Sequence, residues 1–171
     1  MAFYTGAYDS DLLDIIKALL DADKNFLDVG ANIGWYSFLA AHAGVERIVA
    51  FEFMNEYANF IAENFRKEGI PATVVNKGVG APNTFEKYSD PLAKTNGSLI
   101  SLDEYAKVNN IWPDIMKMDI EGGEYDIIKN MESFPFRFML IEFHDTGNRE
   151  DFEELTRKLE TSGYELDIRK E

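Results

Sequence analysis

Five carboxylates and one histidine stand where apolar segments of this chain end. They are Asp28, Glu52, Asp119, Glu121, Glu142 and His144. Carboxylate and imidazole groups accept protons and hold the hydroxyl groups of ligands. Because side chains alternate along a strand, Asp119 and Glu121 are expected on one face of their strand, and Glu142 and His144 on one face of the next. If those two strands are neighbours, the four side chains converge at one edge of a sheet.

The first of these carboxylates opens a glycine-rich turn, D-V-G-A-N-I-G, from Asp28 to Gly34. Glycine lets the backbone come close to a ligand and present N–H groups beside a helix N-terminus. Asn32 tolerates the left-handed conformation that such a turn requires. Glu52, at the end of the next apolar segment, is placed to accept hydrogen bonds from both hydroxyls of a ribose. The pattern predicts a site for an adenosine-bearing cofactor.

The glycine spacing and Asp28 distinguish between two such cofactors. The dinucleotide fingerprint G-x-G-x-x-G needs glycine where this chain has Asn32 and Trp35 after Gly30. A pyrophosphate would be repelled by Asp28, whereas the sulfonium and amino groups of S-adenosylmethionine would be attracted by that carboxylate. The residues therefore favour S-adenosylmethionine over NAD.

The elements that must position these residues alternate between strand and helix. Apolar segments predict strands at residues 26–29, 47–53, 73–76, 115–119 and 138–144, and helical spacing predicts helices at 9–22, 34–43, 55–68, 125–131 and 148–162. Strands that are apolar on both faces and alternate with helices predict an α/β fold with a mostly parallel central sheet. Ligands of such sheets bind beyond the carboxyl ends of the strands, where the acidic residues lie.

Shorter features complete the expected domain. They are a hairpin around residues 84–85 and 98–100, a capping box at 101–104 that opens a short helix, and an edge strand at 164–168. A chain of 171 residues without a linker or repeat predicts a single domain. Its expected parts are an N-terminal helix (1–24), a cofactor-binding core (25–144), and a C-terminal helix with the edge strand (145–171).

Composition and charge restrict the partner and the location. The formal net charge is −14, from 31 acidic and 17 basic residues, which disfavours nucleic acid and anionic membranes as partners. The absence of cysteine excludes disulfides and thiolate metal sites. No segment approaches the ~18 apolar residues of a membrane span, and no signal peptide is recognised. We therefore expect a cytoplasmic protein with a small-molecule partner, and self-association stays open.

Five segments carry a resemblance to a known family. They are FLDVGANIGWYS, IVAFEF, SLISLDEY, DIMKMDIEGGEYDIIKNM and FMLIEFH, in this order from about residue 25 to residue 144. Together they resemble the successive blocks of the FkbM family of class I methyltransferases. The resemblance implies a three-layer Rossmann-like fold with helices on both faces of the sheet. It also implies methyl transfer from S-adenosylmethionine, usually to a hydroxyl of a sugar, polyketide, peptide or other small molecule.

The resemblance also implies where the cofactor is bound. Gly30, Asn32 and Gly34 are expected under its methionine part, Asp28 and Asp119 beside them, Glu52 on the ribose, and Phe53 with the turn at Lys77 and Gly78 along the adenine. A structural role is the alternative for two of these residues. Asp28 could only cap its turn, and Glu52 could be a solvated strand end.

A hydroxyl acceptor must lose its proton, so a positioned base favours the reaction. We predict Asp119 or His144 as base or as anchor of the acceptor, with Glu121 and Glu142 as orienting groups. Two alternatives remain: Glu121 could cap the helix after Gly123, and Lys117 could neutralise carboxylates without touching the substrate. Metal ligands are suggested by Glu142, His144 and Asp145, but they lack a recognised spacing, so no metal is expected.

Other functions stay open from the sequence. The chain is short around its core, so it could be a cofactor-binding subunit or sensor without catalysis. An RNA methyltransferase would share the cofactor but needs a basic surface, and an NAD-dependent oxidoreductase would share the fold but not the glycine pattern.

Overall fold

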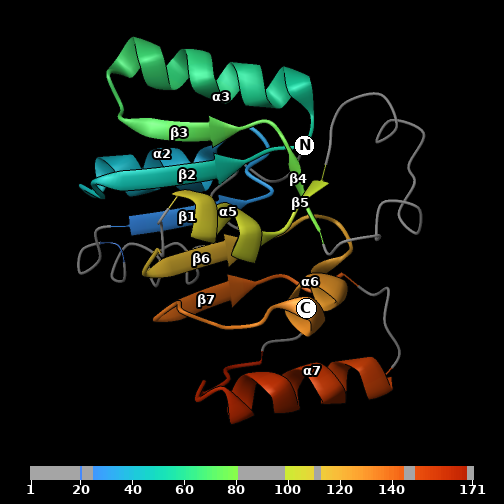
Figure 1. The fold of residues 1–171 in the computed structure, drawn as a ribbon. Coiled ribbons are helices and arrows are strands. Elements are labelled where there is room, and N and C mark those ends of the chain that lie inside the picture. Colours follow the sequence, from blue (N-terminus) through green and yellow to red (C-terminus); the bar gives the residue numbers. More distant parts are fainter. Residues whose placement is uncertain (1–19, 21–24, 81–98, 110–112, 145–148, 169–171) are drawn as a thin grey trace.

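A computed structural model describes residues 20, 25–80, 99–109, 113–144 and 149–168. Its central sheet has five parallel strands, β1 (Asn25–Val29), β2 (Arg47–Phe51), β3 (Ala72–Val75), β6 (Ile115–Met118) and β7 (Phe138–Ile141). Their order is β3-β2-β1-β6-β7. Strands β2 and β3 are added on one side of β1, and β6 and β7 on the other, so the strand order switches between β1 and β6. The carboxyl ends of all five strands lie along one edge (Figure 1). This confirms the predicted α/β fold with a parallel sheet.

Helices pack on both sides of the sheet. They are α2 (Trp35–His42), α3 (Asn55–Glu68), α5 (Leu102–Asn109), α6 (Glu124–Asn130) and α7 (Arg149–Thr161). In Figure 1, α2 lies behind the sheet and α5 in front of it. The predicted bounds of α3 are confirmed, and its C-terminal cap is Gly69 in the left-handed conformation. The Ser101 hydroxyl accepts a hydrogen bond from the Glu104 N–H at 3.1 Å, which is the expected helix cap at α5.

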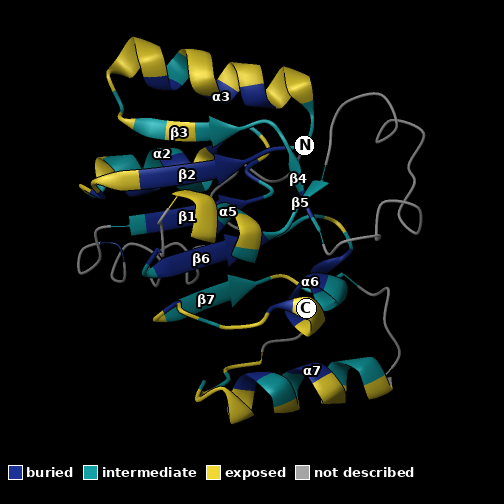
Figure 2. Ribbon diagram, in the orientation of Figure 1, coloured by how far each residue is buried: buried dark blue, intermediate teal, exposed yellow. Residues whose placement is uncertain are grey.

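The apolar core is divided between the two faces of the sheet. Residues of β1, β2 and β6 are almost entirely buried, whereas the outer side of α3 is exposed (Figure 2). Alternation along β1 and β6 places Phe26 and Ile115 under α2, and Leu27 and Met116 on the opposite face. By the same alternation, Asp28 and its β6 partner Lys117 share the α2 face with those apolar residues. Two charged residues therefore stand in the core directly before the strand ends.

Only residues 99–100 of the predicted hairpin are described, and they pair with a segment that was not expected. β5 (Leu99–Ile100) pairs in parallel with β4 (Gly78–Val79), and together they form a separate two-stranded sheet. Gly78 permits this approach, since a Cβ there would lie 2.6 Å from the Leu99 side chain. The other half of the expected hairpin, residues 84–85, lies outside the described residues.

The predicted edge strand at residues 164–168 is wrong, because that segment has no strand pairing. The Tyr164 hydroxyl donates hydrogen bonds to the carbonyls of Phe134 and Phe136, and Tyr164 and Leu166 pack against the core. The segment is therefore held by side-chain contacts and not by backbone hydrogen bonds to a neighbouring strand. Of the predicted helix at residues 9–22, only Leu20 is described, and it is buried. Within the described ranges, no helix has both the length and the apolar character needed to cross a bilayer.

Gly30 offers a test of how tightly the end of β1 is packed. Its φ is +77°, and a Cβ there would lie 1.9 Å from the carbonyl oxygen of Asp119. Because that oxygen belongs to the backbone, Gly30→Ala is expected to lower the free energy of unfolding by about 3 kcal/mol or more, from left-handed strain and overpacking together. Gly44→Ala is the matched control, since Gly44 has φ +87° and nothing within 4 Å of a Cβ. Equal losses for the two variants in urea denaturation would contradict this packing.

Candidate active site

A buried lysine holds the turn after β1 in place. The Lys117 Nζ donates a hydrogen bond to the Gly30 carbonyl at 2.8 Å. It also lies 3.6 Å from Asp28 Oδ1 and 3.7 Å from Asp119 Oδ2, with the ring of Tyr36 5.3 Å away. These contacts show the neutralising role that was the alternative for Lys117, because one cation joins β1, the turn and the end of β6.

Asp28 supports the turn from inside the protein. Its side chain is fully buried, and Oδ2 accepts a 2.6 Å hydrogen bond from the Ser37 hydroxyl on α2. Ser37 was not identified from the sequence, although a small polar residue on the sheet-facing side of a helix was a usable signal. With its visible partners on β6 and α2, Asp28 acts on the shape of the turn, and its contact with a cofactor stays a prediction.

The glycine-rich turn is left-handed where expected but differs from the prediction in its hydrogen bonds. Asn32 has φ +54°, which confirms the left-handed conformation predicted for it, and Gly30 and Gly34 have φ +77° and +85°. The expected presentation of N–H groups to a ligand is wrong for most of the turn. The N–H groups of Gly30 and Ala31 donate to the Phe51 carbonyl at 3.0 and 2.9 Å, and that of Gly34 donates to Ala31. Gly30 here permits close packing against the Asp119 backbone at the end of β6, and Gly34 permits close packing against the Ile61 side chain of α3.

Glu52 lies just beyond β2 and is buried, so it is not a solvated strand end. Its Oε2 accepts the Asn32 N–H and its Oε1 the Met54 N–H, both at 2.6 Å. Burial raises the pKa of Glu52, and these two hydrogen bonds only partly oppose the rise. Each carboxylate oxygen keeps a further lone pair, so the group can still accept two hydroxyls.

Two of the residues expected along the adenine, Phe53 and Gly78, are adjacent in space. A Cβ on Gly78 would lie 3.0 Å from the Phe53 ring. The Asn76 side-chain amide donates to the carbonyls of Glu52 and Phe53 at 2.9 and 3.1 Å, which fixes this loop against the end of β3. The structure thus brings Glu52, Phe53 and Gly78 together at the strand ends.

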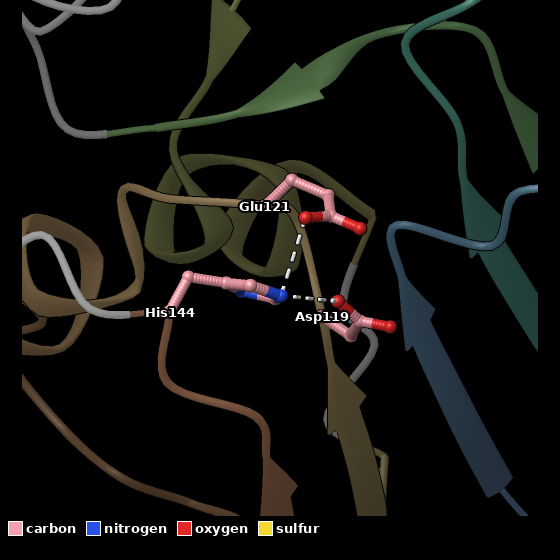
Figure 3. A group of neighbouring side chains, drawn as sticks. All are labelled: Asp119, Glu121 and His144. Carbon is pink, nitrogen blue, oxygen red and sulfur yellow. Dashed lines mark ion pairs between the residues drawn. The ribbon is translucent and has the colours of Figure 1, made fainter.

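The predicted convergence at the ends of β6 and β7 is confirmed, and Figure 3 shows three of the four side chains, those of Asp119, Glu121 and His144. His144 Nε2 lies 3.3 Å from Glu121 Oε2, and 3.8 Å from both Asp119 Oδ1 and Glu142 Oε1. We call these four residues the strand-end cluster. Asp145, which was considered as a metal ligand, lies outside the described residues.

Glu124 is a second residue of this site, after Ser37, that the sequence analysis did not identify. Its side chain is fully buried, and its Oε1 lies 3.1 Å from His144 Nδ1 while accepting the N–H groups of Ile120 and Gly122 at 3.2 and 3.0 Å. It is the last acid of the block K-x-D-x-E-G-G-E, and that position was the available signal. Glu124 fixes the orientation of the imidazole and directs Nε2 toward the other carboxylates.

The alternative that Glu121 caps α6 is wrong. The N-cap is Gly123, which receives no side-chain hydrogen bond, and the Glu121 side chain is 83 % exposed beside His144. Glu121 has φ +60°, followed by Gly122 and Gly123 at +115° and +110°. A non-glycine residue in the left-handed region is strained, and such strain is concentrated at functional sites.

His144 carries opposing influences on its charge. Burial lowers the pKa of His144, but the hydrogen bond and charge of Glu124 and the charges of Glu121 and Asp119 outweigh it, so the pKa is raised. The imidazole therefore keeps a proton to a higher pH than a free histidine.

Comparison with known proteins identifies the family. The model of the methyltransferase FkbM domain matches residues 28–166. The chain belongs to this family. Hexuronic acid methyltransferase AglP of Haloferax volcanii is 26 % identical over 169 residues, which cover 87 % of this chain and 69 % of that protein. This FkbM-family protein is therefore an S-adenosylmethionine-dependent methyltransferase.

Solved structures confirm the class I methyltransferase fold. A precorrin-6y C5,15-methyltransferase from Geobacter metallireducens superposes with a TM-score of 0.54 at 18 % identity, covering 97 % of this chain and 78 % of that one. An O-methyltransferase from Bacillus cereus in complex with SAH gives 0.52 at 12 % identity, covering 92 % and 70 %. At such identities the likeness concerns the fold.

The buried charge network of the FkbM-family protein is testable through Lys117. Lys117→Met leaves Asp28 buried without its cation, so we expect the free energy of unfolding to fall by about 3–5 kcal/mol in urea denaturation. Lys129→Met is the matched control, because Lys129 pairs with Glu154 on the exposed surface at 2.9 Å. A small change in the first variant, similar to that of the control, would show that Lys117 is dispensable.

The raised pKa of His144 can be measured directly. Histidine occurs twice in the chain, so His42→Gln leaves a single imidazole for NMR titration of chelator-treated protein. We expect His144 to titrate above 6.5, and Glu124→Gln to lower that value by removing a negative charge while keeping an oxygen for the Ile120 and Gly122 N–H groups. A pKa below 6.5 in the parent protein would mean that burial outweighs the carboxylates.

Proposed function

We propose that this methyltransferase transfers the methyl group of S-adenosylmethionine to a hydroxyl of a sugar or glycan. One observation carries the proposal: the turn at Gly30 lies between the Glu52 carboxylate, which is suited to bind a ribose, and the strand-end cluster, which is suited to accept a proton. On the first side, the Asn32 N–H is bonded to Glu52. On the second, Lys117 joins the Gly30 carbonyl to Asp119. Donor and acceptor sites so connected can hold two reactants in contact.

The described residues fit the cofactor at the Glu52 end. The Glu52 carboxylate is anchored by two backbone N–H groups and retains acceptor capacity for the two ribose hydroxyls. Phe53 and Gly78 form an apolar border beside it, suited to the adenine ring. The acidic groups Asp28 and Asp119 lie on the far side of the turn, where the positive sulfonium and amino groups would be favoured.

The strand-end cluster fits a hydroxyl acceptor. In the proposed reaction the acceptor oxygen bonds to the methyl carbon, the carbon–sulfur bond breaks with its electron pair on sulfur, and the hydroxyl proton passes to the cluster. Asp119 and His144 are the candidates for base or anchor, with Glu121 and Glu142 oriented around the same imidazole nitrogen. Removal of a positioned base costs about a hundredfold or more in rate.

The sugar acceptor is supported by a relative. AglP, whose name describes a methyltransferase of hexuronic acid, aligns with 87 % of this chain. An oxidoreductase is not supported, because the chain belongs to a methyltransferase family. A cofactor-binding subunit without catalysis remains the second candidate, and turnover distinguishes it from the enzyme.

Calorimetric titration of the purified chain with S-adenosylmethionine, S-adenosylhomocysteine and NADH tests the cofactor end. We expect the first two ligands to bind and NADH not to bind. Glu52→Gln should weaken binding of S-adenosylmethionine about tenfold or more, because hydrogen bonds to a charged group are lost. Glu56→Gln, an exposed change on α3, is the matched control, and circular dichroism checks that both variants fold. Binding of NADH alone would overturn the proposal.

The same preparation tests the acceptor end. Release of S-adenosylhomocysteine is measured with paired neutral and uronic-acid sugars as acceptors. We expect repeated turnover with a sugar hydroxyl, and a loss of about a hundredfold or more in kcat in Asp119→Ala and in His144→Ala. Near-normal turnover in both variants would contradict the roles given to these two residues, and binding without turnover would favour the non-catalytic subunit.

A further inference from the structure

We propose that Asp119, Glu121 and His144 bind a divalent transition-metal cation, of the Mn²⁺ or Zn²⁺ class, at the acceptor end of the site. The inference rests on the proposed function and specifies how the acceptor hydroxyl is held. It departs from the expectation of no metal in the sequence analysis. That expectation considered Glu142, His144 and Asp145, whereas the fold brings together Asp119, Glu121 and His144.

The fold brings donor atoms of the three side chains close together. One nitrogen of His144 and one oxygen each of Asp119 and Glu121 lie within 4.8 Å of one another (Figure 3). Neighbouring donors around an ion with bonds of about 2.1 Å are roughly 3 Å apart. The distance from Nε2 to Glu121 Oε2 is 3.3 Å and that to Asp119 Oδ1 is 3.8 Å, so the proposed coordination requires rotations of the carboxylate side chains that bring these donors closer together.

Glu124 prepares the histidine for this role. It holds Nδ1 at 3.1 Å, which places the proton on Nδ1 and leaves the lone pair of Nε2 directed at Asp119 and Glu121. A carboxylate behind a ligating histidine is the usual support of a metal site. Glu124 is fully buried, and its Oε2 has no hydrogen-bond partner among the described residues. A buried carboxylate with an unsatisfied oxygen is costly, and a cation on the imidazole it supports would offset that cost.

The local charge also favours a cation. Carboxylates of Asp119, Glu121 and Glu142 surround Nε2, and Glu124 lies behind the ring. Lys117 is the described basic side chain that reaches Asp119, and its ammonium is shared with Asp28 and the Gly30 carbonyl. Among the described residues whose contacts are given above, acidic groups therefore predominate around Nε2, and a divalent ion placed there would be favoured.

The ligand set indicates which ion is expected and what it does. One imidazole with two carboxylates suits Zn²⁺ or Mn²⁺ better than Ca²⁺, which prefers oxygen ligands alone. Three protein ligands leave positions open, as in catalytic sites. An acceptor hydroxyl placed there becomes more acidic, and Glu142, which is not one of the three ligands, can take its proton. Asp119 and His144 then serve as anchors of the acceptor and not as bases.

Calorimetric titration of the chelator-treated full chain with MnCl₂ and, separately, ZnCl₂ tests the site. Glu124→Gln and Glu160→Gln are compared, because each removes one negative charge but only Glu124 touches His144. We expect 1:1 binding that is unchanged in Glu160→Gln and about tenfold or more weaker in Glu124→Gln. Asp119→Asn and His144→Gln should abolish it. Circular dichroism confirms folding, and in the His42→Gln background the His144 NMR signals should respond to the first equivalent of ion.

The outcomes separate this inference from the proposed function. Equal binding in all variants, or no saturable binding, would show adsorption to an acidic protein and overturn the cation site. S-adenosylmethionine is titrated into the same samples. If it binds and neither ion does, the cation inference fails while the function stands. If an ion binds as expected but S-adenosylmethionine does not, the site is supported and the proposed function fails.

Discussion

The site depends on one buried ammonium group. Lys117 is only 5 % exposed, yet its Nζ contacts the Gly30 carbonyl and lies within 4 Å of Asp28 and Asp119. A buried lysine requires acceptor groups in fixed positions around its ammonium, because removing that charge from water costs free energy. This requirement fixes where β1 ends, how the glycine turn leaves it and where Asp119 stands. Gly30 is needed at the same point, since no side chain fits against the Asp119 carbonyl.

From this fixed point the two halves of the site extend in opposite directions along the strand ends. Toward β2, the Asn32 N–H orients the Glu52 carboxylate, and Asn76 holds the following loop. Toward β7, Asp119 is followed by a left-handed stretch from Glu121 to Gly123. In this segment the N–H groups of Ile120 and Gly122 donate hydrogen bonds to the Glu124 carboxylate. The strand order places the two halves on either side of β1, because β1 lies between β2 and β6. Ligands of such sheets bind at this switch in strand order.

Much of this arrangement could be predicted from the sequence, because parallel strands and helices have simple periodicities. The α3 bounds, the left-handed Asn32 and the convergence of Asp119, Glu121, Glu142 and His144 follow from such patterns. What failed depends on long-range contacts. The segment at residues 164–168 has the residue types of a strand, but it is held by hydrogen bonds from the Tyr164 hydroxyl to carbonyls of another loop. In the glycine-rich turn, the N–H groups of Gly30 and Ala31 donate to the Phe51 carbonyl and not to a ligand. Glu124 was missed because its role depends on burial, which a single acidic letter does not reveal.

The strand-end cluster therefore poses a choice between two positive charges. A proton on His144 satisfies Glu124 and the neighbouring carboxylates, as the raised pKa of His144 indicates, but an imidazolium cannot accept a proton from a substrate. A divalent cation satisfies the same carboxylates, occupies the nitrogen that the proton would use, and keeps positions free for the acceptor. It would also allow an acidic sugar to approach a protein with a net charge of −14. The acidity around His144 is thus better suited to a cation than to a general base.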